Sequence, residues 1–217
     1  MGNKTRILEL FAGIGGAARA FGKRGEVVAA VDINQNARAV YALNFEHPYQ
    51  VKSIQDLAHR EIQELEAEIW WVSAPCQPYT RRGNQLDLAD RRSAGLKHVI
   101  KLIQASPPDH LFLENVTGFN GSQARDELIR SLEKSNHNVT ELNLCPTALG
   151  IPNRRPRYYL IASRKVDFQW RPGTYQPKRI VEFLDQEETE RFTLDPLWAS
   201  KYEAGLNIVD RLSSTSN

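Results

Sequence analysis

A lone thiol, a carboxylic acid and a pair of arginines follow one another along this chain. Cys76 lies in a Pro-Cys-Gln-Pro run, Glu114 closes a short apolar run, and Arg155 and Arg157 stand two residues apart. A thiolate is a nucleophile and a carboxylic acid can donate a proton. Arginines on one side of a strand can hold a carbonyl and a phosphate by charge-assisted hydrogen bonds. The set predicts covalent nucleophilic catalysis with acid assistance.

Each of these residues also has a purely structural interpretation. A cysteine is most often a small buried hydrophobe, and we interpret Cys145, which no polar loop follows, in this way. Cys76 instead precedes a polar loop with several arginines, an electropositive setting that favours the thiolate. Glu114 is either a strand-end cap or an acid that Asn115 orients. Arg154 is expected to point away from the side that the arginine pair shares.

A glycine turn follows the first apolar run of the chain. Gly13, Gly15 and Gly16 allow the backbone to turn sharply and to approach a ligand closely. The pattern is incomplete as a dinucleotide fingerprint and better suits S-adenosylmethionine, which has no pyrophosphate. Asp32, 19 residues after Gly13, is placed to accept hydrogen bonds from both ribose hydroxyls. The structural alternatives are a tight strand-to-helix turn and, for Asp32, a helix N-cap.

Composition narrows the class of protein. The chain has 217 residues, 41% hydrophobic and 25% charged, which fits one globular domain with or without a short appendage. The net charge is only +2, and each arginine cluster taken alone could be a solvated surface. The two cysteines lack the spacing of a zinc site or a disulfide framework, so we expect no metal. The start has no apolar signal region and no run is long enough to cross a bilayer, which favours the reducing cytoplasm.

Apolar runs and helical spacing alternate along the first three quarters of the chain. Strands are predicted at 6–11, 26–31, 69–72, 110–113, 139–144 and 157–162, and helices at 17–23, 36–45, 98–105 and 127–134. This alternation predicts an α/β fold with a doubly wound, mainly parallel sheet. Ligands of such sheets bind beyond the carboxyl ends of the strands, and all the motifs above fall at those ends.

Longer stretches resemble the cytosine-C5 methyltransferases. The resemblance is strongest to the DNA-methyltransferase-2-like branch, which modifies a cytosine of the tRNA anticodon loop. It rests on residues 74–81, 87–92, 113–119 and 146–153, the last running into the arginine pair. It is strong over residues 5–165 and continues faintly from Leu194 to Asp210. It implies an S-adenosylmethionine-binding, Rossmann-like catalytic domain at 1–165. Residues 166–217 are then a linker and a truncated lead-in to a target-recognition region that we expect to be missing.

The resemblance also implies a reaction and a set of site residues. The reaction is S-adenosylmethionine-dependent methylation of a cytosine in nucleic acid, with tRNA favoured and DNA a close second. Cys76 would add to C6 of the base while Glu114 donates a proton to N3. Catalysis is assigned to Cys76, Glu114, Arg155 and Arg157, and cofactor binding to Phe11, Gly13, Gly15, Gly16, Asp32, Ile33, Ile54 and Pro75.

Two other functions remain as alternatives. The chain could be a catalytically idle fragment, or a cofactor-binding subunit of a split methyltransferase whose second chain supplies the missing segments. A nicotinamide-dependent dehydrogenase is disfavoured by the incomplete glycine pattern and by the Pro-Cys-Gln run. Nucleic acid, with or without that second chain, is the expected partner, and a membrane is not.

Overall fold

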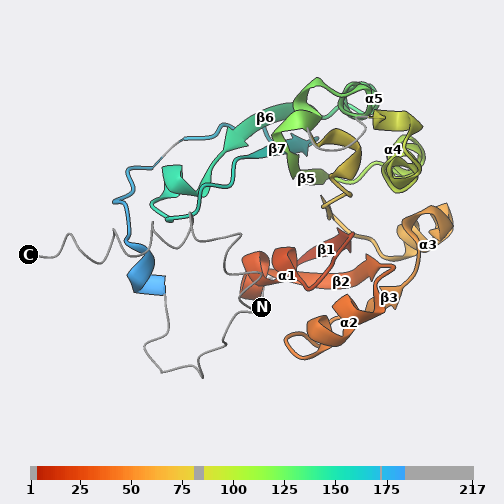
Figure 1. Ribbon diagram of the computed structural model, residues 1–217. Coiled ribbons are helices and arrows are strands. Elements are labelled where there is room, and N and C mark those ends of the chain that lie inside the picture. The colour runs from red at the N-terminus through yellow and green to blue at the C-terminus, as the bar shows by residue number, and fades with distance from the viewer. Residues whose placement is uncertain (1–3, 81–85, 172, 184–217) are drawn as a thin grey trace, which may run out of the picture. The chain divides into compact units, whose positions relative to one another are not determined.

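Seven strands form one sheet in the computed structural model of the protein (Figure 1). Their order across the sheet is β3-β2-β1-β4-β5-β7-β6. The strands are β1 (Thr5–Leu10), β2 (Gly25–Asp32), β3 (Tyr49–Val51), β4 (Ile69–Val72), β5 (His110–Val116), β6 (Asn138–Leu144) and β7 (Arg157–Ser163). Strands β1 to β5 are parallel, whereas β7 runs antiparallel to both β5 and β6. The expected mainly parallel sheet is confirmed.

The structure describes residues 4–80, 86–171 and 173–183. The chain divides into two compact units, residues 1–178 and 179–217. The whole sheet belongs to the first unit, and the described part of the second holds one short 3-10 helix, Ile180–Phe183. The faint resemblance expected from Leu194 to Asp210 falls on residues outside the described ranges.

The segment after β7 forms no helix or strand in its described residues, 164–171 and 173–179. Its backbone is nevertheless attached to the sheet domain. Thr140 donates a hydrogen bond to the carbonyl of Phe168 at 2.8 Å, and the Lys178 amide donates to the carbonyl of Gly150 at 2.9 Å. The first compact unit therefore extends to Lys178, while a functional boundary at residue 165 stays a prediction.

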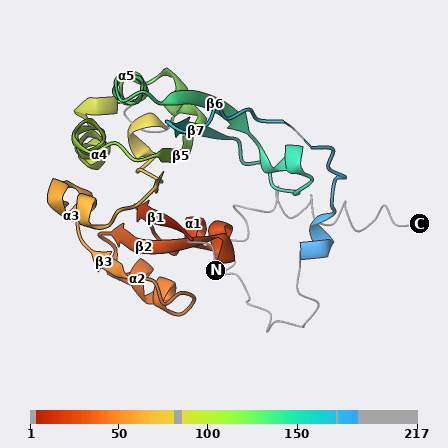
Figure 2. The same cartoon turned by 180° about the vertical axis from the view of Figure 1, so that it is seen from behind.

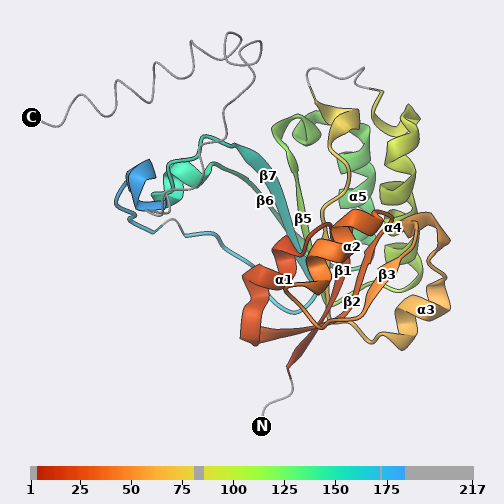
Figure 3. The same ribbon diagram turned by 60° about the horizontal axis from the view of Figure 1, so that its bottom comes forward.

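Helices cover the sheet from both sides. The helices are α1 (Gly16–Phe21), α2 (Gln35–Ala42), α3 (His59–Glu64), α4 (Ala94–Ala105) and α5 (Gln123–Lys134). Figure 3 shows α1 and α2 over β1 and β2, and Figures 1 and 2 show α4 and α5 side by side on the other side. This is the doubly wound arrangement that the sequence predicts.

Strand alternation divides the core into two hydrophobic clusters. In β1, Leu8 and Leu10 are fully buried in the larger cluster, which includes side chains of α3, α4 and α5. Ile7 points to the other face and packs in a smaller cluster with Ala18 of α1 and Tyr41 of α2. Successive side chains of a strand point to opposite faces, so β1 is covered on both sides.

Capping explains why helix α5 begins earlier than predicted. Helix α5 starts at Gln123 rather than 127, because Ser122 accepts a hydrogen bond from the amide of Arg125 at 3.1 Å. The Asp87 carboxylate also accepts from the amides of Gln123 and Ala124, at 2.5 and 3.2 Å. These bonds satisfy backbone donors that lack intrahelical partners. Helix α4 also starts earlier, at residue 94 instead of 98, but Ser93 makes no capping bond there and the helix continues the 3-10 turn Arg91–Ser93.

Candidate active site

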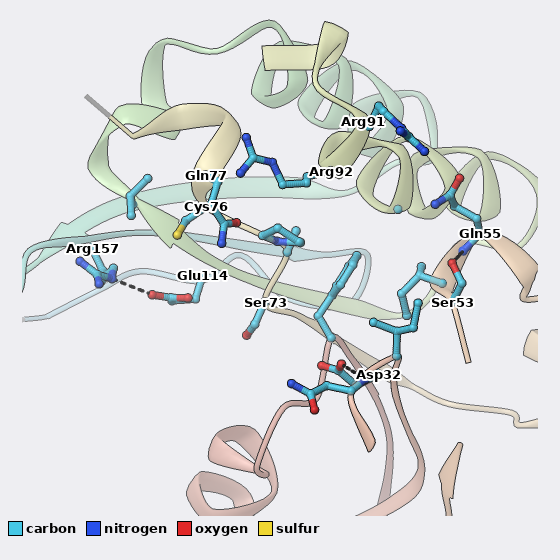
Figure 4. Close-up of a pocket in the computed structure, with 18 of the residues that line it drawn as sticks. Asp32, Ser53, Gln55, Ser73, Cys76, Gln77, Arg91, Arg92, Glu114 and Arg157 are labelled. Carbon is cyan, nitrogen blue, oxygen red and sulfur yellow. Dashed lines mark hydrogen bonds and ion pairs between the residues drawn. The ribbon is translucent and has the colours of Figure 1, made fainter. Parts of the chain in front are cut away.

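A cavity of about 760 Å³ lies beyond the carboxyl ends of β1, β2, β4 and β5 (Figure 4). Nine of the twelve residues assigned from the sequence line it: Phe11, Asp32, Ile33, Ile54, Pro75, Cys76, Glu114, Arg155 and Arg157. Gly13, Gly15 and Gly16 are not among its described lining residues. Residues from six separate segments of the chain thus meet in one cavity, as the position of the motifs at strand ends predicts.

The two ends of the cavity differ in chemistry. Figure 4 shows Cys76, Glu114 and Arg157 together at one end and Asp32 with Ser53 at the other. One end therefore holds a nucleophile, a carboxyl group and a cation. The other offers a carboxylate beside apolar side chains, with room between the two ends for a ligand of nucleoside size.

The loop that carries the thiol is fastened to the end of β5. Asn115, only 1% exposed, donates a hydrogen bond to the carbonyl of Ala74 at 3.2 Å. The amide of Tyr79 donates to the carbonyl of Cys76 at 2.9 Å. A side chain at Gly118 would overlap the carbonyl oxygen of Tyr79, so glycine allows this close approach. The sequence suggested that Asn115 orients Glu114. That suggestion is wrong, because its amide holds the cysteine loop instead.

Glu114 lies inside β5 rather than after it, because the strand continues to Val116. Its side chain therefore points to the face opposite Leu113 and reaches the cavity. Arg157, the first residue of β7, lies opposite Val116 in the antiparallel register. Its Nε is 3.1 Å from Oε1 of Glu114, and both side chains are less than one third exposed.

The two arginines of the predicted pair do not share a strand face. Arg155 precedes β7, and its amide donates to the carbonyl of Asn153 at 3.0 Å. Both Arg155 and Arg157 nevertheless line the cavity, Arg155 from the loop and Arg157 from the strand.

Cys145, interpreted from the sequence as a packing residue, is half-exposed in the structure. Hydrogen bonds from Thr147 lower the pKa of the Cys145 thiol, and the positive charge of Arg154 lowers it further. Cys145 is not among the described residues that line the cavity. Its thiol is therefore a useful internal comparison for Cys76.

Asp32 anchors the glycine turn. Its Oδ2 accepts a hydrogen bond from the amide of Gly13 at 2.9 Å, and its Oδ1 accepts from the amide of Asn34 at 2.9 Å. The N-cap of α2 is Asn34, which accepts from the amides of Asn36 and Ala37. The N-cap interpretation of Asp32 is therefore wrong. Each carboxylate oxygen has a second lone pair, so Asp32 keeps the capacity to accept from a ligand.

The glycine turn contains a run of left-handed backbone. Gly13 has φ 52° and Gly15 has φ 94°, and Phe11 adopts φ 58° although it carries a side chain. A side chain at Gly15 would overlap the rings of Phe45 and Tyr41, so this glycine is needed for packing on the side away from the cavity. A left-handed non-glycine residue costs on the order of 1–3 kcal/mol and is typical of functional sites. Phe11 meets this description, since it lines the cavity.

Two further arginines that the sequence marked only as a basic cluster also line the cavity. Figure 4 shows Arg92 extending toward Gln77 and Cys76, and Arg91 extending the other way, toward Gln55. Arg92 is held by Asp90, with Nε to Oδ1 at 2.9 Å and Nη2 to Oδ2 at 2.6 Å. These bonds lower the pKa of Asp90 to about 2. An acidic residue two positions before an arginine in a loop was the available signal.

Membrane-spanning helices and metal sites are both absent from residues 4–80, 86–171 and 173–183. There, no helix has the length and apolar character needed to cross a membrane. Within those same ranges, no three histidine, cysteine, aspartate or glutamate side chains gather as a metal site.

Comparisons with known proteins agree with this geometry. The model of the family described as C-5 cytosine-specific DNA methylase matches residues 5–213. The human tRNA (cytosine(38)-C(5))-methyltransferase is 40% identical over 201 residues, which are 88% of this chain and 50% of that protein. A Dictyostelium discoideum DNA (cytosine-5)-methyltransferase is 36% identical over 219 residues, 96% of this chain and 56% of that protein. The crystal structure of S. pombe Dnmt2 methyltransferase superposes with a TM-score of 0.80 at 26% identity, covering 93% of this chain and 66% of that one. The chain spans about half the length of the curated relatives that it matches.

Proposed function

The chain belongs to the C-5 cytosine-specific DNA methylase family, and on this premise we propose that it methylates C5 of a cytosine in tRNA. The observation that carries the proposal is the meeting of Cys76, Glu114 and Arg157 at one end of a cavity whose other end holds Asp32. The tRNA preference is supported by the name of the human relative, at 40% identity. The name of the Dictyostelium relative keeps DNA as the second substrate class.

The cavity has the size and the donor set that S-adenosylmethionine needs. Its volume of about 760 Å³ lies within the range of small-molecule sites. Asp32 would accept from the ribose hydroxyls, and Phe11, Ile33 and Ile54 would pack against the adenine. Pro75 borders the same space, while Gly13, Gly15 and Gly16 shape the turn that bounds it. S-adenosylmethionine, when bound, supplies the electrophilic methyl group that C5 of the base accepts.

Cys76 and Glu114 would activate the base, because C5 of cytosine is a poor nucleophile. The Cys76 thiolate adds to C6 while Glu114 donates a proton to N3, which makes C5 enamine-like. Arg157 contacts Oε1 of Glu114, and we assign Oε2 to the base. Arg155 would bind the base carbonyl or a phosphate at the cavity rim. After methylation, loss of the C5 proton to a base breaks the C6–S bond and restores the Cys76 thiolate, and N3 returns its proton to Glu114.

The target base must leave its stack to enter this cavity. Bases of an anticodon loop are partly unstacked, so their extrusion costs less than that of a base in a duplex. This favours tRNA over DNA on energetic grounds. We place the activity in the cytoplasm, where reducing conditions keep Cys76 free.

A methyl-transfer assay tests this function. Labelled methyl groups are transferred from S-adenosylmethionine to total tRNA and to DNA, by the chain alone and with a chain that supplies the C-terminal half of a relative. We expect labelled tRNA, loss of label with Cys76→Ala and retention with Cys145→Ala. Label in DNA alone would overturn the substrate assignment. Label that survives Cys76→Ala would overturn the mechanism.

A cofactor-binding subunit is the second candidate, and the observation that favours it is the separate end of the cavity where Asp32 lies away from Cys76. In that case the chain binds S-adenosylmethionine in calorimetry but transfers methyl groups only with the second chain present. Transfer by the isolated chain would exclude this candidate.

A further inference from the structure

Glu9 is a buried carboxylic acid directly behind the glycine turn. It is the next-to-last residue of β1 and is only 2% exposed. Its Oε1 accepts a hydrogen bond from the amide of Ala17, at the start of α1, at 3.2 Å. Because Ala17 follows Gly15 and Gly16 directly, this bond fixes the end of the turn. None of the roles assigned to the cavity residues uses Glu9.

Glu9 is also one end of a chain of hydrogen bonds. The hydroxyl of Tyr41, on α2, lies 3.3 Å from Oε2 of Glu9 and 3.1 Å from Nδ1 of His47. Tyr41 is fully buried and His47 is partly buried, so the bond between Tyr41 and Glu9 lies away from bulk water. A single tyrosine proton cannot be donated to both neighbours at once. The chain therefore has two arrangements: Tyr41 donates to ionised Glu9 and accepts from Nδ1–H of His47, or it donates to Nδ1 of His47 and accepts from protonated Glu9.

Two tyrosine side chains hold the glycine turn from the side away from the cavity. The hydroxyl of Tyr49 donates to the carbonyl of Gly13 at 3.2 Å, and the ring of Tyr41 leaves no room for a side chain at Gly15. On the cavity side, Asp32 holds the turn through the Gly13 amide. The shape of the turn thus depends on one carboxylate that borders the cavity and one that is buried.

Burial decides which arrangement of the proton is favoured. Desolvation raises the pKa of Glu9 to about 7, although hydrogen bonds from Tyr41 and from the backbone oppose this shift. Burial also lowers the pKa of His47, while the charge of Glu26 raises it. The titratable groups that face Glu9 are Tyr41 of α2 and Tyr49 of β3. Beyond them, His47 interacts with Glu26, and Tyr49 with Asp32.

We propose that Glu9 is a positioning residue for the cofactor turn and that its proton, shared through Tyr41 with His47, makes S-adenosylmethionine binding depend on pH. The inference rests on the proposed function, because it takes the turn as part of the cofactor site. Neutral Glu9 holds Ala17 without burying a charge. Ionised Glu9 places a charge among apolar neighbours, which is unfavourable, so the turn loosens and the affinity falls.

Calorimetry at pH 6 and pH 8 tests this dependence. The dissociation constant of the wild-type chain should rise by about fivefold between the two, as expected for a pKa of about 7 in the ordered turn and one unit lower in the loosened turn. Glu9→Gln keeps a carbonyl for the Ala17 amide but cannot ionise, so its affinity should stay at the wild-type pH 6 value. Glu64→Gln, which changes an exposed carboxylate of α3 away from this chain of hydrogen bonds, is the matched control and should follow the wild type. If the dissociation constant of Glu9→Gln rose between pH 6 and pH 8 as much as that of the wild type, the inference would be overturned.

Hydrogen exchange of the cofactor-free chain separates this inference from the proposed function. Protection of residues 13–19, corrected for the intrinsic rate, should fall from pH 6 to pH 8 in the wild type and stay constant in Glu9→Gln. Tyr41→Phe removes a bond that favours ionised Glu9, so it should move the step to higher pH. The inference would be overturned if protection did not fall with pH in the wild type. It would also be overturned if the fall occurred at the same pH in Tyr41→Phe as in the wild type. The exchange step without S-adenosylmethionine binding at any pH would instead refute the proposed function.

Discussion

The Nε atom of Arg157 lies 3.1 Å from Oε1 of Glu114, and the pair joins two strands that run in opposite directions. The register of β5 and β7 places Arg157 opposite Val116, two residues beyond Glu114 on the same face. The contact is therefore built into the sheet. Glu114 lies near the end of β5 and Arg157 at the start of β7. Because β7 runs antiparallel to β5, both positions lie at the same edge of the sheet.

Loss of this ion pair should slow methyl transfer more than it weakens substrate binding. Arg157→Gln leaves Glu114 without its partner, so its proton is poorly placed for N3. We expect a fall of about 100-fold in single-turnover rate, the lower range for a misplaced general acid. The matched control is Arg154→Gln, which lies beside Cys145 and should keep the wild-type rate. Equal single-turnover rates for the two variants would show that Arg157 has no catalytic role.

Removal of Asp32 should weaken cofactor binding without unfolding the chain. Asp32→Ala loses an acceptor for the ribose and the anchor of the Gly13 amide. Loss of charged hydrogen bonds of about 1.5–3 kcal/mol corresponds to an affinity lower by roughly 10-fold to 100-fold. Calorimetry with S-adenosylmethionine measures this change.

Asn34→Ala is the comparison that separates the two roles at this strand end. It removes the N-cap of α2 and should lower the free energy of unfolding by about 1 kcal/mol while the affinity is kept. If Asn34→Ala weakens binding as much as Asp32→Ala does, the effect belongs to the helix and not to the carboxylate.

Glu9 should make the wild-type chain less stable as the pH rises. Its pKa in the folded chain, about 7, lies above the ordinary value of 4.5. The folded state therefore binds a proton that the unfolded state releases, and this contribution is complete below pH 4.5. The contribution to the free energy of unfolding is lost as the pH rises through about 7. The total loss should be about 3 kcal/mol, since each pKa unit corresponds to about 1.4 kcal/mol. Urea unfolding at pH 4.5 and 8 measures it, and Glu9→Gln should lack this fall.

Local sequence pattern predicted the parts of the fold that it encodes directly. The long strands are apolar and β-branched, and every one of them lies within a few residues of its predicted position. Strand β3 has three residues and α3 six, which is too short for a periodic pattern, and neither was predicted. The insertion of β7 between β5 and β6 depends on pairing between distant segments and leaves no local signal.

The candidate site was predictable in its residue types but not in its contacts. Cys76 and Glu114 were found because a thiol and an acid at strand ends are unusual there. The bond from Asn115 to Ala74 spans 41 residues of sequence and follows only from the pairing of β4 with β5. Glu9 did leave a signal, because a charged residue inside a buried strand needs a partner.

The assignment of the nucleophile can be tested by trapping. With 5-fluorocytosine in the substrate, fluorine at C5 cannot leave as a proton does, so a covalent adduct through the attacking thiol should accumulate. We expect an adduct with the wild type, none with Cys76→Ala, and an undiminished one with Cys145→Ala. Glu114→Gln should form the adduct much more slowly, because protonation of N3 assists addition at C6.

The trapping experiment is run with the complementing C-terminal chain that restores turnover, and peptide mass spectrometry locates the modified residue. Cys145 is the demanding comparison, because its thiol is half-exposed and its pKa is lowered by Thr147 and Arg154. General thiol reactivity would therefore modify Cys145 as well. Only Cys76 lies in the cavity with Glu114, so a mechanism-based adduct should form there alone. An adduct at Cys145 would show that the cavity does not hold the nucleophile.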